Sequence, residues 1–582
     1  MFKSEPQKHP WIPQREVAIC PWETDKIRGD YTNPHASLLP NIYRYSRRQM
    51  AQYMRMLRQM GFTGVQFLDS CYSWNRYGSP EAFHDALIRM MTAAHEEGLQ
   101  TSLWVWGAFF NGHGWCDPDV VYTPAPGNTS FADPKVRACF ERYYDLYAEL
   151  APYTDRLIGH YFDPGCLTET ADIIAYFKLL RDKFRLQNPN VRLAMDTWGS
   201  PDGYAEALAN SDLGDCLLME HPSAEYWPCE RRVRFRETAR KNGFPVGVWG
   251  WYTCEYETDQ MSAMYVNAHV LQNRYLAVRA EADHVMSPAY WSEMDAGHLY
   301  NLFSLYCAGQ FLIDPERDPD LLLREIVEMI WQGDSADAMY NALQLIERIR
   351  SGDRWETYWW TSPEFRWGTG DLQKDLADIE ACFPAVERVA QDRAASSVRL
   401  ALPFDPWVLA KLILPHLEQM RLLCVFQCNM RTLEEQLAAG ASPDALYRGL
   451  DEILTPIPDF NTWVGDFMQI ERREQYRIAR DFCARAGIPV PFCASRFEEL
   501  RCWALEKASV FQRGLAEPFL FDSSFVSEGY LAYPKEEALR VMDSLYRDGH
   551  VLYQGNGRYI LTRWQDYRFD FEVASHHSDF AG

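Results

Sequence analysis

The sequence lacks any run of about 18 apolar residues, the length that a membrane-spanning helix needs. Its N-terminal segment also lacks the apolar stretch of a secretory signal peptide. These two absences predict a soluble protein of the cytoplasm that has no membrane partner.

Paired cysteines are absent as well. The 15 cysteines are an odd number and are scattered singly, with no Cys-x-x-Cys spacing among them. A disulfide framework is therefore not indicated, and reduced thiols agree with a cytoplasmic location.

Positive charge is scarce. Lysine and arginine number 58 against 81 aspartate and glutamate residues, which gives a formal net charge of −23, and no concentrated basic patch offsets it. Because such a surface repels phosphate backbones, nucleic acid is not expected as a partner.

Aromatic residues, by contrast, are plentiful, at 14% of the chain with 20 tryptophans. Most buried tryptophans fill hydrophobic cores. The faces of Trp and Tyr are also the surfaces on which sugar rings stack, so the excess is compatible with a carbohydrate ligand.

The first part of the chain repeats one pattern eight times, a short apolar strand followed by an amphipathic helix. Glycines such as Gly61 and Gly98 end the helices, and Asp133-Pro134 begins one. Parallel strands need a crossover helix between them, so eight such units predict a closed TIM (β/α)8 barrel. The predicted strands are residues 17–20, 64–69, 102–106, 157–163, 191–196, 216–220, 246–251 and 284–287.

An open doubly wound sheet is the alternative for this α/β pattern. Such a sheet usually carries a glycine-rich phosphate loop after its first strand, where this chain has Cys20-Pro21-Trp22-Glu23. The barrel is therefore favoured.

Three domains are predicted from the change in pattern along the chain. Residues 1–315 form the barrel, residues 316–490 form an all-helical domain, and residues 491–582 form a small α+β tail. The tail contains a helix over residues 536–548 and a hairpin that turns at Gly555-Asn556-Gly557. Helix-then-hairpin units also occur in DNA-binding modules, but the tail has few basic residues.

Acids and aromatics stand at the ends of the predicted strands, where a barrel of this kind builds its active site. Glycoside hydrolysis needs a carboxylic acid and a second carboxylate that face each other across the sugar. Asp163, Glu220 and Glu255 are the candidate catalytic residues. The candidate substrate-binding residues are Asp69, Trp106, His160, Asp196, Trp198, His221, Trp251, Tyr290 and Trp291.

Structural roles are also open to the three acids. Asp163 lies in Phe162-Asp163-Pro164-Gly165, a good turn sequence, and Glu255 stands near the start of a predicted helix, where a carboxylate is favoured. The spacing leaves open which two of the acids form the catalytic pair.

The chain resembles barrel glycoside hydrolases that carry a helical domain after the barrel, as in the β-hexosaminidase, O-GlcNAcase and α-glucuronidase families. The likeness covers about residues 15 to 350 and rests on this order of domains and on the segments 298–303 and 312–315. It implies hydrolysis of a glycosidic bond without a cofactor. The hexosaminidase-like families have two adjacent acids after strand four, whereas Pro164 follows Asp163 here.

Two other functions are compatible with the sequence. A metal-dependent barrel hydrolase would use His160, Asp163, Glu220 and His221 as ligands, although no His-x-His follows the first strand. A barrel that binds sugars without cleaving them is the other, because fold does not fix function. The expected partner is a carbohydrate, and homo-oligomerisation is left open.

Overall fold

A computed structural model describes most of the chain. The described residues are 10–19, 45–69, 80–106, 131–160, 169–196, 213–220, 229–250, 266–282, 288–293, 302–350, 371–392, 399–454, 470–489, 518–529 and 535–562, with a few isolated positions between these ranges.

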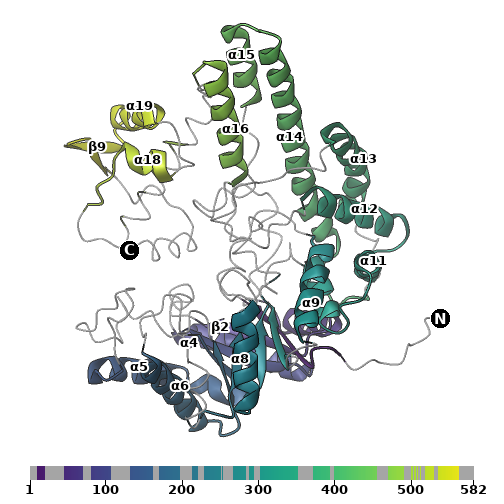
Figure 1. Cartoon of the computed structure of the whole chain (residues 1–582), viewed down its shortest axis with the longest axis vertical. Helices are drawn as coiled ribbons and strands as arrows, with labels where there is room; N and C mark the ends of the chain where they lie inside the picture. Colours follow the sequence, from purple (N-terminus) through teal and green to yellow (C-terminus); the bar gives the residue numbers. More distant parts are fainter. Residues whose placement is uncertain are drawn as a thin grey trace.

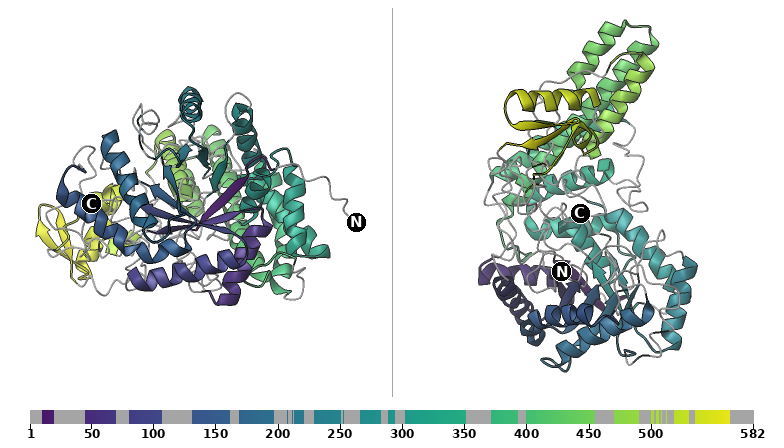
Figure 2. Two further views of the ribbon diagram at one scale, coloured as in Figure 1. Left: turned by 90° about the horizontal axis from the view of Figure 1, so that it is seen from below. Right: turned by 90° about the vertical axis from the view of Figure 1, so that its left-hand side faces the viewer.

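Eight parallel strands close into a barrel, which confirms the predicted fold (Figure 2, left). The barrel closes where β1 pairs with β8, with Gln14 opposite Tyr290 and Val17 opposite Glu293. The strands are β1 (Gln14–Ile19), β2 (Gly64–Asp69), β3 (Gln100–Trp106), β4 (Arg156–His160), β5 (Arg192–Asp196), β6 (Leu217–Glu220), β7 (Val246–Trp249) and β8 (Tyr290–Glu293).

Helices surround the barrel, and local sequence sets their ends. Ser46 and Gln49 form a capping box at the start of α2, and Asp133 caps α5 directly before Pro134. Gly61 and Gly98, which follow α2 and α4, have φ of 106° and 78°, a conformation that side chains other than glycine disfavour. The helices are α2 (Arg47–Gln59), α4 (Pro80–Glu96), α5 (Pro134–Leu146), α6 (Thr170–Arg185), α8 (Cys229–Lys241), α9 (Ala268–Ala282) and α10 (Leu302–Phe311), with a 3₁₀ segment η3 (Ala148–Tyr153).

The eighth strand differs from the prediction. The sequence placed it at residues 284–287, whereas β8 is Tyr290–Glu293. Its polar residues Ser292 and Glu293 are fully buried, so the strand shows none of the alternation of polar and apolar residues that marks a half-exposed strand.

Side chains fill the barrel. An apolar cluster inside it includes Trp104 and Trp249, whose ring centroids are 4.6 Å apart. Beside this cluster the carboxylate of Glu16 accepts hydrogen bonds from Arg156 at 2.8 Å and from Ser102 at 2.6 Å. The interior is therefore a packed core and not a pore, as is usual for this fold.

The described residues from 319 to 486 are mainly helical and extend away from the barrel (Figure 1). One hydrophobic cluster runs from Ile12 to Cys424, and it joins the barrel to the first three of these helices and to the start of the fourth. A second cluster, from Phe426 to Ile488, holds the remaining helices together. The helices are α11 (Pro319–Ile330), α12 (Gly333–Arg350), α13 (Leu372–Gln391), α14 (Trp407–Ala438), α15 (Pro443–Ile453) and α16 (Ile470–Ala486).

A small C-terminal unit has its own core. It contains α18 (Ser523–Gly529), α19 (Lys535–Arg547) and the antiparallel strands β9 (Val551–Gly555) and β10 (Arg558–Leu561). Gly555, Asn556 and Gly557 all have positive φ, which confirms the predicted hairpin turn. The exact domain boundaries stay predictions.

Among the described helices, none combines the length and the apolar character that crossing a membrane requires.

Candidate active site

Seven of the eight barrel strands end on an acid, a tryptophan or a histidine. Their last residues are Asp69, Trp106, His160, Asp196, Glu220, Trp249 and Glu293, and β1 ends on Ile19. Because all eight strands are parallel, these ends meet at one rim of the barrel. The backbones of five of the residues predicted from the sequence, Asp69, Trp106, His160, Asp196 and Glu220, are thus brought together.

Five other predicted residues lie outside the described residues: Asp163, Trp198, His221, Trp251 and Glu255. Asp163 comes three positions after the end of β4, and Glu255 comes six positions after the end of β7. Their roles stay predictions.

Glu220, the third predicted catalytic acid, is fully buried and binds Arg236 of α8. Nε of Arg236 donates to Oε2 of Glu220 at 2.7 Å, and Nη2 donates to Oε1. Burial alone would lower the pKa of Arg236, but the bonds to Glu220 outweigh it and the pKa is raised. Both carboxylate oxygens are therefore engaged by one buried guanidinium.

The side chain of Glu220 faces the helices. Leu217 and Met219 belong to the cluster inside the barrel, whereas Leu218 belongs to the cluster between the strands and the helices. Successive residues of a strand point to opposite faces, so Glu220 lies on the side of Leu218, where Arg236 meets it. This placement suits a role in fastening β6 to α8.

Glu293 at the end of β8 lies in a buried aromatic cluster. Its Oε1 accepts a hydrogen bond from Nε1 of Trp291 at 2.7 Å and another from the hydroxyl of Tyr275 in α9. Burial, together with the charge of Glu293, raises the pKa of Tyr275 well above its ordinary value. Trp291, predicted to bind substrate, has no exposed surface and packs 5.2 Å from the ring centroid of Tyr275.

Tyr290, also predicted to bind substrate, is the first residue of β8 and therefore lies at the opposite end of that strand from the rim. It is fully buried inside the barrel, where its hydroxyl donates to Oε2 of Glu16 at 2.6 Å and accepts a bond from Gln66. Arg156 lies 4.3 Å above its ring. The contacts of this side chain are thus made within the barrel core.

Sequence reasoning missed the partners of these strand-end acids. Arg236 follows Glu220 by 16 positions, and Tyr275 precedes Glu293 by 18. For Tyr275 the sequence carries a signal, because Tyr275 stands four residues after Leu271 and so lies on the same helix face, which is buried. Arg236 carried no such signal, because α8 contains several other arginines.

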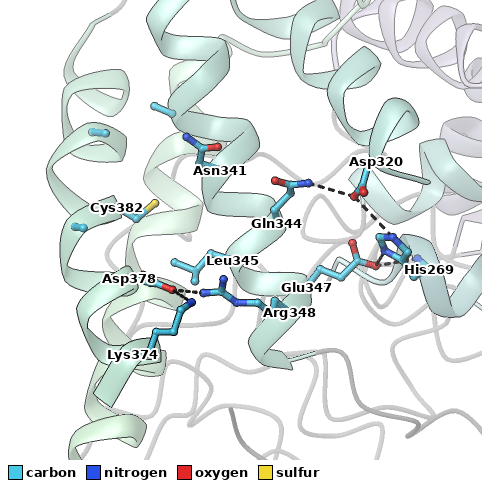
Figure 3. A pocket seen from close by; sticks show the side chains of 13 residues that line it. His269, Asp320, Asn341, Gln344, Leu345, Glu347, Arg348, Lys374, Asp378 and Cys382 are labelled. Atoms are coloured by element: carbon cyan, nitrogen blue, oxygen red, sulfur yellow. Dashed lines mark hydrogen bonds and ion pairs between the residues drawn. The ribbon is translucent and has the colours of Figure 1, made fainter. Parts of the chain in front are cut away.

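A pocket of about 790 Å³ lies between α9, α11, α12 and α13 (Figure 3). At one end His269 lies beside Glu347 and Asp320, and at the other Asp378 accepts bonds from Arg348 and Lys374 at 2.6 and 2.9 Å. The charged side chains that line it pair with one another. In the part of the chain that the structure describes, no group of three His, Cys, Asp or Glu residues has a geometry that could hold a metal.

Comparison with known proteins gives distant structural matches. No protein-family model matches the chain, and no curated protein does. A GH138 enzyme targeting pectin rhamnogalacturonan II is similar over 82% of this chain and 63% of its own, at 8% identity and a TM-score of 0.41. A glycoside hydrolase family 5 enzyme from Prevotella bryantii is similar over 52% of this chain and 96% of its own, at 12% identity and a TM-score of 0.33.

A GH113 β-1,4-mannanase matches 46% of this chain and 93% of its own, at 12% identity and a TM-score of 0.31. At such identities and scores, none of these proteins identifies what this chain binds or cleaves. The barrel fold rests on the strand pairing of the chain itself.

Proposed function

We propose that this chain is a glycoside hydrolase whose active site lies at the C-terminal rim of the barrel. The observation that carries the proposal is the composition of that rim, where the four neighbouring strands β2 to β5 end on Asp69, Trp106, His160 and Asp196. Acids supply the proton transfer and the nucleophile or base of glycoside hydrolysis, and aromatic faces hold sugar rings.

Asp163 and Glu255 are proposed as the two catalytic carboxylates. Both follow strand ends, β4 and β7, so both belong to the connections that build the rim. Glu220 is the less suitable candidate, because its two oxygens bind Arg236 and its side chain has no exposed surface. Substrate positioning is assigned to Asp69, Trp106, His160, Asp196, Trp198, His221 and Trp251.

Turnover of chromogenic aryl glycosides tests the proposal. Asp163→Asn and Glu255→Gln each remove an ionisable group with little change in volume, so each should lower kcat by roughly 10²-fold to 10⁴-fold. Glu237→Gln is the matched control, since Glu237 lies exposed on α8, and it should act like the wild type. Wild-type rates in both acid variants would refute the assignment of the two acids.

The same panel separates hydrolysis from the alternatives. Sugar binding without turnover by the wild type would favour the non-catalytic barrel. Loss of turnover after chelation, restored by a divalent metal, would favour the metal-dependent hydrolase.

A further inference from the structure

The N-terminus of α9 is capped by a residue from another helix. The backbone N–H of His269 donates to Oε1 of Glu347 in α12 at 2.9 Å. Asn267, at the position where a cap residue normally stands, is fully buried, and among the described residues neither polar atom of its side chain has a hydrogen-bond partner. The capping of α9 therefore depends on the helical region.

The side chain of His269 takes part in the same contact (Figure 3). Its Nδ1 lies 3.2 Å from Oε1 of Glu347, and its Nε2 lies 3.7 Å from Oδ1 of Asp320 in α11. One imidazole thus stands between carboxylates of two helices of the helical region. The ring is about half exposed, while Glu347 is buried.

The charges that face His269 are mainly negative. They are Asp318 and Asp320 at the start of α11 and Glu347 in α12. The nearest cations of the pocket, Arg348 and Lys374, are paired with Asp378. The hydrogen bond with Glu347 raises the pKa of His269 above its ordinary value, and Asp320 and Asp318 add to this effect.

We propose that His269, Glu347 and Asp320 form a pH-sensitive tie between the barrel and the helical region. When His269 is protonated, it links both carboxylates to the start of α9, and when it is neutral, the links weaken. A helix that follows a barrel strand starts at the rim where the strand ends. The tie thus acts on the start of α9, independently of whether the rim cleaves sugars.

The sign of the effect follows from the raised pKa. The stabilisation is complete below the pKa of a histidine in the unfolded chain, about 6.5, and is lost as pH rises through the higher folded value. The tie should therefore hold in mildly acidic solution and weaken in mildly alkaline solution.

Two substitutions in the full-length chain test the tie. His269→Lys carries a positive charge from about pH 5.5 to 8.5, and His269→Gln carries none over that range. The difference in Tm between wild type and His269→Gln should be on the order of 1–3 °C near pH 5.5 and vanish near pH 8.5. Wild type and His269→Lys should melt at similar temperatures near pH 5.5, and near pH 8.5 the lysine variant should be the more stable of the two, because it alone keeps the charge.

Hydrogen–deuterium exchange adds a local measurement, because the thermal transition of the whole protein can be insensitive to this region. Deuterium uptake by peptides covering residues 266–275 is compared between wild type and His269→Gln at the same pH. The variant should exchange faster near pH 6 and at the wild-type rate near pH 8.5. Uptake and Tm differences that stay constant across this range would overturn the proposal.

Discussion

Glu220, an acid at the end of a barrel strand, takes part in a buried ion pair. The sequence shows an acid at the end of an apolar strand, and in the structure that acid pairs with the buried guanidinium of Arg236. A buried ion pair adds little net stability, but removing one partner leaves the other charged and unpaired in the interior.

Glu220→Gln should therefore destabilise the fold by about 3–5 kcal/mol, because Arg236 loses its charged partner in a buried position. Chemical denaturation measures the effect. Glu281→Gln is the control: Glu281 lies 4.0 Å from Arg236 and its side chain is 22% exposed, so its loss should cost much less. A Glu220→Gln variant of wild-type stability that lacks turnover would instead make Glu220 catalytic.

Gly250, directly after β7, is required by close packing. A Cβ atom at this position would lie 2.5 Å from Oε1 of Glu293 and closer still to Nε1 of Trp291. Gly250→Ala should therefore cost about 1–3 kcal/mol through displacement of these buried side chains. Gly214→Ala serves as the control, since a Cβ there would meet no atom within 4 Å. Equal stability of the two variants, measured by denaturation, would contradict this account.

At the scale of elements, the sequence predicts best where the signal is local. The start of α5 at Asp133, the end of α2 near Gly61 and the turn at Gly555–Gly557 depend on residues within a few positions, and all were predicted. The position of β8 was not, because its polar residues are buried by partners far away in the chain. Glu293, for example, is satisfied by Tyr275 of α9. For the same reason the sequence did not separate structural acids from candidate catalytic ones.

The capping box of α2 gives a prediction for a single element. The side chain of Ser46 accepts a hydrogen bond from the backbone N–H of Gln49, so Ser46→Ala should destabilise the protein by about 1 kcal/mol. Ser46→Asp keeps an acceptor at the cap and should stay near wild type. A thermal or denaturant transition compares the three proteins, and an alanine variant as stable as wild type would show that the cap contributes nothing.

At the scale of the whole molecule, the barrel shares its hydrophobic core with the helices that follow it. The cluster from Ile12 to Cys424 includes residues of α11, α12, α13 and α14. Polar contacts cross the same junction, since the side chain of Gln59 in α2 hydrogen-bonds the backbone of Arg399 and Ala401 at 2.9 and 2.8 Å. The barrel boundary near residue 315, predicted from pattern alone, therefore divides a continuous core.

A chain ending at residue 315 should consequently fold poorly, because it would expose the apolar surface that α11–α14 cover. A chain ending at residue 489 keeps this core and loses only the C-terminal unit, which has a separate one. Soluble yield and circular dichroism melting compare the two. Cooperative melting of the shorter chain at the temperature of the full-length protein would show that the barrel is independent.

The filled interior of the barrel affects how a ligand can reach the strand ends. Trp104, Trp249 and the Glu16–Arg156 pair close the centre of the barrel, so nothing passes through it from rim to base. Whatever binds at the strand ends therefore enters and leaves on the rim side of the barrel. For a hydrolase with such a site, substrate and product share that side, and competitive inhibition by product is the kinetic behaviour to expect.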